Sequence, residues 1–191
     1  MRLFTAVLPP PDQLAELAAE VDALLRLPGA DALRWTGRPG WHFTLAFMGE
    51  VDEALLPDLR TRLARAAHRT APFPLRLHGS GHFGQRTLWT GAAGALDDMR
   101  LLGERSDAAA RRAGIPMDEH RAYHAHLTLA RARTGVHADL RPFVDGLAHF
   151  EGARWQVSEL ALVRSNLPAG GTPGEGPRYE TLDTWPLGQG G

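Results

Sequence analysis

His42-Phe43-Thr44-Leu45-Ala46, in the first third of the chain, is nearly repeated by His126-Leu127-Thr128-Leu129-Ala130 further along. A random chain of 191 residues with 9 His, 12 Thr and 28 Leu would contain only about 0.08 His-x-Thr-Leu strings. Two such strings therefore require a structural explanation.

Both stretches are predicted to lie in apolar β-strands. Successive side chains of a strand point to opposite faces, so a His and a Thr two positions apart share one face. The opposite face is apolar and is expected to join the core, since it carries Phe43, Leu45, Leu127 and Leu129. Each stretch thus places an imidazole beside a hydroxyl, and together they predict two halves of one site.

Strand and helix patterns follow each other along the rest of the chain. Alternating apolar residues predict strands over 2–8, 33–36, 41–48, 73–77, 87–90, 123–130, 155–163 and 179–185. Helical spacing predicts helices from Asp12 up to Pro28 and over 53–68, 96–113 and 140–147, and the glycines of 78–84 predict a loop. Helix, loop and His-x-Thr-Leu occur twice in that order, and some strands follow each other without a helix between them. The expected fold is α+β, a duplicated α+β unit rather than a doubly wound sheet.

Composition limits the function classes. The chain has no cysteine, which excludes disulfides, thiolate metal sites and a cysteine nucleophile. The net charge of −1 gives no global attraction to polyanions, but all 21 basic residues are arginine, whose planar guanidinium suits phosphate. There is no signal-peptide pattern and no apolar run of about 20 residues, so a cytoplasmic protein that does not contact membranes is expected.

Paired His and Thr residues suit reactions of a phosphodiester. Histidine titrates near neutral pH, so one imidazole can remove a proton from the nucleophile while another protonates the departing oxygen. A threonine hydroxyl can donate a hydrogen bond to a non-bridging phosphate oxygen as charge develops there. This chemistry requires neither a metal ion nor a covalent intermediate.

Further residues extend this pattern over nearly the whole chain. The two stretches continue as His42 to Val51 and as Tyr123 to Arg131, and they are accompanied by Arg2-Leu3-Phe4, Gly81-His82-Phe83-Gly84, Leu88-Trp89, Tyr179-Glu180-Thr181-Leu182 and Trp185-Pro186-Leu187. In this the chain resembles the two-histidine (2H) phosphoesterases, and within them the RNA 2′,3′-cyclic phosphodiesterases, also called LigT-like proteins or 2′-5′ RNA ligases. It departs from the family at Ala125, because the second motif there commonly starts Phe-His-Pro-His.

The resemblance implies one bilobal domain over residues 1–191, in which two pseudo-twofold lobes with antiparallel sheets line a central cleft. Each lobe would contribute one His-x-Thr pair. By the same resemblance, His42 is the proton donor to the departing 3′ oxygen and His126 is the proton acceptor that activates water. Thr44 and Thr128 would bind the phosphate.

The activity implied by the resemblance is hydrolysis of 2′,3′-cyclic phosphate ends of RNA to 2′-phosphomonoesters, with reversible 2′-5′ RNA ligation as a related reaction. No cofactor is implied, and members of the family are mostly monomers. Two alternatives remain: a 2H phosphoesterase for another cyclic nucleotide or a 2′-5′ oligonucleotide, and an RNA-end binding protein without turnover. The intact pairs argue against pure binding, since binding alone does not need acid and base groups.

Four other residues are candidates for substrate contacts. Arg131 follows the second motif, but in an ideal strand it points away from the face of His126. His124 lies on that face and is expected to support the site or the substrate. Phe83 and Tyr123 suit stacking on a base, although aromatic residues are more often part of a core.

A metal centre is the competing interpretation of the second motif. Asp118-Glu119-His120 precedes His124 and His126, which lie two apart on one strand face in an acceptable ligand geometry. It is less favoured because the acidic residues are expected in a loop. The prediction is a site without a metal ion.

Overall fold

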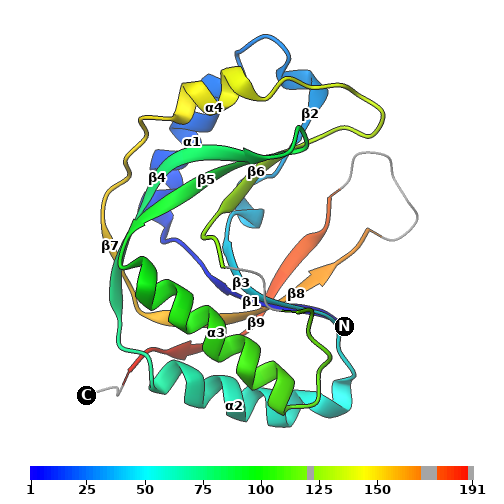
Figure 1. The fold of residues 1–191 in the computed structure, drawn as a ribbon, viewed down its shortest axis with the longest axis vertical. Coiled ribbons are helices and arrows are strands. Elements are labelled where there is room, and N and C mark those ends of the chain that lie inside the picture. Colours follow the sequence, from blue (N-terminus) through cyan, green and yellow to red (C-terminus); the bar gives the residue numbers. More distant parts are fainter. Residues whose placement is uncertain (120–122, 169–175, 189–191) are drawn as a thin grey trace.

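Two antiparallel sheets with helices packed beside them make up the fold (Figure 1). The computed structural model describes residues 1–119, 123–168 and 176–188. The first sheet consists, in spatial order, of β3 (Phe43–Glu50), β1 (Arg2–Val7), β8 (Glu159–Asn166) and β9 (Arg178–Pro186). The second consists of β2 (Leu33–Trp35), β6 (Leu127–Ala132), β5 (Thr87–Gly94), β4 (Phe73–Phe83) and β7 (Trp155–Val157).

The helices divide between the two sheets. They are α1 (Pro11–Leu24), α2 (Leu56–His68), α3 (Leu96–Arg112) and α4 (Arg141–Leu147), with short 3-10 turns at Ala30–Ala32, Arg38–Gly40 and Glu53–Leu55. α2 and α3 pack on the first sheet through β9 and β3, whereas α4 packs on β4 and β5 and contacts α1. Figure 1 shows the two helix pairs at opposite ends of the molecule. Among the described residues, no helix is long and apolar enough to cross a membrane.

The same order of strand pairing occurs twice along the chain. β1 pairs with β3 across α1, and β5 pairs with β6 across α3. After β3, α2 leads to β4 of the second sheet, which lies beside β5. After β6, α4 leads first to β7 of the same sheet and only then to β8 of the first sheet, which lies beside β1. The helix that connects β5 to β6 also crosses between the sheets. This helix, α3, follows a strand of the second sheet but packs on β3 of the first. This pseudo-twofold order confirms the predicted α+β fold with two antiparallel sheets.

The core lies on the helix-facing sides of the sheets. Phe43, Leu127 and Leu129 are fully buried, and Leu45 is nearly so, as the apolar face of the two motifs predicts. A Cβ atom added at Gly103 in α3 would lie 3.6 Å from the Leu45 carbonyl oxygen, so α3 packs closely on this side of β3. The partly buried Thr44 lies on the other side, away from α3.

Several element boundaries differ from the sequence expectation, since α1 ends at Leu24 and β5 runs on to Gly94. The predicted loop 78–84 is mostly strand, since β4 continues to Phe83 with a bulge at Gly79, where φ is +65°, and turns only after it. The strand predicted over 155–163 is divided at Ser158 between β7 of the second sheet and β8 of the first. The strand predicted over 123–130 begins only at Leu127, because the backbone of the preceding residues pairs with no neighbouring strand.

Candidate functional site

The two His-x-Thr pairs line one cavity of about 780 Å³. His42 and Thr44 enter it from the first sheet, and His126 and Thr128 enter it from the second. Each histidine immediately precedes the first residue of its strand, β3 or β6. The structure therefore brings together the four residues that the repeat in the sequence singles out.

A β-bulge occurs at the same place in both motifs. In the pairing of β1 with β3, Ala6 lies opposite Thr44 and Thr5 opposite Ala46, which leaves Leu45 as an extra residue. In the pairing of β5 with β6, Trp89 lies opposite Thr128 and Leu88 opposite Ala130, which leaves Leu129 as the extra residue. A bulge shifts the alternation of side chains by one position.

The bulges bring an additional side chain of each strand to the cavity. Phe47 follows the first bulge and Arg131 the second, and both line the cavity beside the threonines. This corrects the expectation from an ideal strand that Arg131 points away from the face of His126. Without the extra Leu129, an odd separation of five residues would place the two side chains on opposite faces.

Aromatic rings enclose His42. Its imidazole stacks on Phe4 of β1, with ring centroids 4.7 Å apart, and meets the edge of Tyr179 of β9 at 5.0 Å. Burial lowers the pKa of His42 to about 4, against the opposing effect of a hydrogen bond with the backbone of Gly40, and the nearby His126 lowers it further. The imidazole of the unliganded protein is therefore neutral at pH 7.

His126 is held by the backbone in a corresponding way. Its Nδ1 atom lies 2.8 Å from the carbonyl oxygen of His124, two residues upstream, as Gly40 is two residues upstream of His42. A carbonyl oxygen only accepts, so Nδ1 carries the proton and Nε2 keeps its lone pair. Burial lowers the pKa of His126, and so do the charges of His124 and Arg131. This geometry leaves Nε2 free to accept a proton.

The lining of the cavity is basic. It contains Arg2, Arg34, Arg131 and Arg178, and among the described residues no aspartate or glutamate lines it. The guanidinium of Arg2 lies over the Phe47 ring, 5.5 Å from its centroid. Burial raises the pKa of Tyr179, and the three charges of Arg131, Arg34 and Arg2 oppose that rise. Such a cavity favours an anionic ligand.

The aromatic candidates lie in different places. The Phe83 ring meets His126 edge to face, with centroids 4.8 Å apart, and it is 43% exposed. His124 packs against Trp89 at 4.9 Å, beside a second cavity of about 490 Å³. Tyr123 lines this second cavity and packs against α3 near Gly103, so the structure does not bring it to His42.

The described residues form no site with metal-binding geometry. No three His, Asp or Glu side chains come together within residues 1–119, 123–168 and 176–188. The rings of His124 and His126 lie nearly parallel with their centroids 6.3 Å apart. His120, the third histidine of the competing metal interpretation, lies outside the described residues.

Several residues of the cavity were not predicted as site residues, and four of them are Arg2, Phe4, Arg34 and Tyr179. Three of these four stand in segments that carry the family resemblance, Arg2-Leu3-Phe4 at the start and Tyr179-Glu180-Thr181-Leu182 near the end. The signal was present in these segments, but nothing in the local pattern showed that Phe4 of β1 and Tyr179 of β9 pack against His42. Arg34 carried no signal of its own.

Comparisons with known proteins identify the family. A profile of the 2′-5′ RNA ligase superfamily matches residues 9–168. An RNA 2′,3′-cyclic phosphodiesterase of Thermus thermophilus is 32% identical, over 98% of this chain and 90% of its own length. Another of that name, from Geobacillus stearothermophilus, is also 32% identical over 80% of this chain, which spans about half (47%) of that relative.

Solved structures agree with this assignment. The protein TT0787 of Thermus thermophilus has a TM-score of 0.76 and 31% identity, and the match covers 99% of this chain and all of the other. LigT of E. coli, complexed with 3′-AMP, also has a TM-score of 0.76, with 26% identity over 98% of both chains. The chain therefore belongs to the 2′-5′ RNA ligase superfamily, a group of two-histidine phosphoesterases.

Proposed function

We propose that this protein is an RNA 2′,3′-cyclic phosphodiesterase, which hydrolyses the cyclic phosphate at an RNA end to a 2′-phosphomonoester. The observation that carries the proposal is the meeting of two His-x-Thr pairs, one from each sheet, in a cavity lined by arginines. The names of the relatives that match over most of the chain agree with it.

His126 acts as the proton acceptor. Its Nδ1–H donates to the carbonyl of His124, which leaves the Nε2 lone pair for a water molecule. As that water attacks phosphorus, its proton passes to Nε2 and the new P–O bond forms. Burial, together with the neighbouring positive charge of Arg131, lowers the pKa of this imidazole and so favours its neutral form until the proton arrives.

His42 acts as the proton donor. The bond between phosphorus and the 3′ oxygen breaks, and the imidazolium of His42 gives its proton to that oxygen, which leaves a 3′ hydroxyl and a 2′-phosphate. Because the pKa of His42 is about 4 in the unliganded protein, this proton must be stabilised by the substrate. The anionic cyclic phosphate does so, since an opposite charge nearby raises the pKa of an imidazole.

Thr44, Thr128 and Arg131 hold the phosphate in this mechanism. The two hydroxyls donate to the non-bridging oxygens, on which negative charge increases in the transition state. The guanidinium of Arg131 adds a planar donor pair on the same side as Thr128. Phe83, which is exposed next to His126, offers a stacking surface for the terminal base, and His124 supports His126 through its backbone carbonyl.

The same groups can catalyse 2′-5′ ligation. A 5′ hydroxyl takes the place of water, so His126 accepts the proton of that hydroxyl and His42 protonates the departing 3′ oxygen. In the reverse step, in which the 3′ hydroxyl attacks and the 5′ oxygen departs, the two histidines exchange roles. One chain supplies both pairs, so the site needs no second copy and the protein is proposed to act as a monomer in the cytoplasm.

A short RNA with a 2′,3′-cyclic phosphate end tests the proposal, assayed in EDTA with wild type, His42→Ala and His126→Ala. The expected product is a 2′-phosphate, and each variant should be slower by about 10²–10⁴-fold, the usual contribution of general acid or base catalysis. His149→Ala is the matched control, because this histidine is exposed and lies outside the cavity. Absence of turnover by the wild type, or turnover only with added metal, would contradict the proposal.

A further inference from the structure

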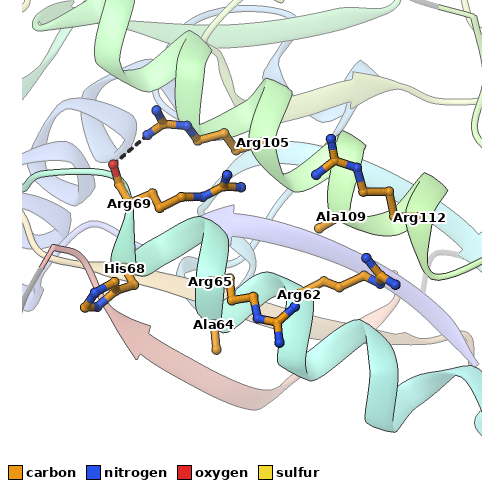
Figure 2. A pocket seen from close by; sticks show the side chains of 8 residues that line it. All are labelled: Arg62, Ala64, Arg65, His68, Arg69, Arg105, Ala109 and Arg112. Atoms are coloured by element: carbon orange, nitrogen blue, oxygen red, sulfur yellow. Dashed lines mark hydrogen bonds between the residues drawn. The ribbon is translucent and has the colours of Figure 1, made fainter.

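A groove rich in arginine lies between α2 and α3, apart from the cavity that holds the histidines. Its volume is about 630 Å³, and Figure 2 shows its lining side chains. We call it the arginine groove; it is lined by Arg62, Ala64, Arg65, His68, Arg69, Arg105, Ala109 and Arg112. Five of these eight residues are arginines, and no acidic residue is among them.

Helical spacing creates two facing rows of arginines. Arg62, Arg65 and Arg69 are separated by three and four residues, so they lie along one side of α2 and its C-cap. Arg105 and Arg112 are seven residues apart on α3, with the buried Ala109 between them. Two rows of arginines, one on each helix, therefore line the space between α2 and α3.

Carboxylates neutralise arginines elsewhere on these two helices, but hardly at all in the groove. Arg62 pairs with Asp58, and Arg105 donates to the Arg69 carbonyl and the Thr70 hydroxyl, which are neutral acceptors. Within residues 1–119, 123–168 and 176–188, the guanidinium groups of Arg65, Arg69 and Arg112 have no hydrogen bond or ion pair.

The adjacent arginines behave differently. Arg60, Arg100 and Arg111 all pair with carboxylates, at Asp183, at Asp97 and Glu104, and at Asp107 respectively. The side chains of the groove thus carry a local excess of positive charge in a chain whose net charge is −1. Like charges held close together repel, and a bound polyanion relieves that repulsion.

We infer that the arginine groove binds the sugar–phosphate backbone of RNA, as a contact distant from the reacting end. The inference rests on the proposed function for the identity of the polyanion. Arginine binds phosphate through paired donors, and two rows allow a strand to be held between them. α3 covers the side of β3 that faces away from Thr44, so the groove contacts nucleotides other than the one in the cavity.

The test compares the double variant Arg65→Gln/Arg112→Gln with the control Arg26→Gln/Arg154→Gln. The control removes the same charge from two exposed arginines outside the groove. Affinity is measured over a range of salt concentrations for single-stranded RNA of about 20 nucleotides and for a dinucleotide. Both RNAs end in a 2′-phosphate, the proposed product, so that no turnover disturbs the measurement.

The expected result is a loss of affinity for the long RNA alone. Losing two phosphate contacts lowers the slope of log affinity against log salt by about 1.4, so between 50 and 200 mM salt the wild type loses roughly seven-fold more affinity than the variant. Dinucleotide binding, and turnover of a dinucleotide with a cyclic phosphate, should stay unchanged. The control should keep the wild-type slope.

Three results would overturn the inference: an unchanged slope in the groove variant, an equal change in the control, or loss of binding to polyglutamate instead of RNA. The last would identify an acidic protein surface as the partner. Failure of the proposed function has a different signature, because the wild type would then not hydrolyse the cyclic dinucleotide. Even in that case, a loss of affinity for long RNA in the Arg65→Gln/Arg112→Gln variant would still support the inference that the arginine groove binds RNA.

Discussion

The imidazole of His42 lies against the ring of Phe4, with centroids 4.7 Å apart and an angle of 29° between the planes. Phe4 is buried in β1, and Tyr179 of β9 packs against both Phe4 and the imidazole, with ring centroids 5.7 and 5.0 Å away. Strands from the two ends of the chain therefore fix the orientation of His42 and remove water from it. This enclosure is the main reason why its pKa is low.

Opening the enclosure should raise the pKa of His42. In Tyr179→Ala, water reaches the imidazole, and we expect its pKa to move from about 4 toward the ordinary value of 6.5. Tyr179→Phe keeps the ring and should leave the pKa low. NMR titration of the His42 ring protons measures both, and equal pKa values in the two variants would show that burial by Tyr179 is not the cause. Looser positioning of the imidazole in Tyr179→Ala should also reduce kcat by about tenfold or more.

The low histidine pKa values predict an acidic optimum for kcat/KM. One imidazole must be protonated and the other neutral, so the reactive fraction is largest between the two pKa values of the pair. Burial lowers both below 6.5, and kcat/KM should therefore fall about tenfold per pH unit on the alkaline side, beginning below pH 6.5. The alkaline limb of kcat should lie at higher pH, because bound phosphate stabilises the imidazolium. Coincident limbs in the two profiles would contradict this role of the substrate.

The hydroxyl groups of Thr44 and Thr128 should matter more than their shape. Thr44→Val keeps the volume and removes the donor, and we expect kcat to fall by about 10²-fold, as for the loss of one donor to a developing oxyanion. Thr44→Ser keeps the donor and should retain most activity. The corresponding variants Thr128→Val and Thr128→Ser should show the same two effects if the two lobes bind the phosphate symmetrically. Steady-state measurement of kcat for each variant, on RNA that ends in a 2′,3′-cyclic phosphate, tests these expectations.

Arg131 should contribute to both binding and pH dependence. In the wild type, Arg131 lines the cavity and its charge contributes to the low pKa of His126. Arg131→Gln removes that charge, so we expect KM to rise about tenfold and the pKa of His126 to rise as well. Arg133→Gln is the control on the same segment, since this side chain is exposed and donates to the Asp31 carbonyl. Equal effects of the two substitutions on KM would argue for general charge rather than a specific contact.

The sequence predicts the site better than it predicts the path of the chain. A near-repeat is a local signal, so it located both His-x-Thr pairs and indicated that they face one space. A bulge is a property of paired strands, and nothing local shows that Leu45 and Leu129 are extra residues that bring Phe47 and Arg131 to the cavity. The same reason explains the division at Ser158, because alternation is unbroken where the chain changes sheets.

Two glycines should respond to alanine with opposite signs. A Cβ atom at Gly81 in β4 would overlap the Trp89 indole, which packs on Phe83 and His124 beside His126. Gly81→Ala therefore has to displace this ring, and we expect unfolding to become about 1–3 kcal/mol more favourable, the usual cost of overpacking. The shifted Trp89 should also disturb Phe83 and reduce activity on RNA ends.

Gly103, within α3, provides the comparison. A Cβ atom there meets its nearest neighbour, the Leu45 carbonyl oxygen, at 3.6 Å, which is ordinary contact. Alanine removes the entropic disadvantage of glycine in a helix, so Gly103→Ala should stabilise the protein by about 0.5–1 kcal/mol with activity unchanged. Urea unfolding of both variants measures the two effects. A loss of stability in Gly103→Ala similar to that in Gly81→Ala would mean that α3 packs on β3 too tightly for a methyl group, and that the closeness of Trp89 is not what distinguishes Gly81.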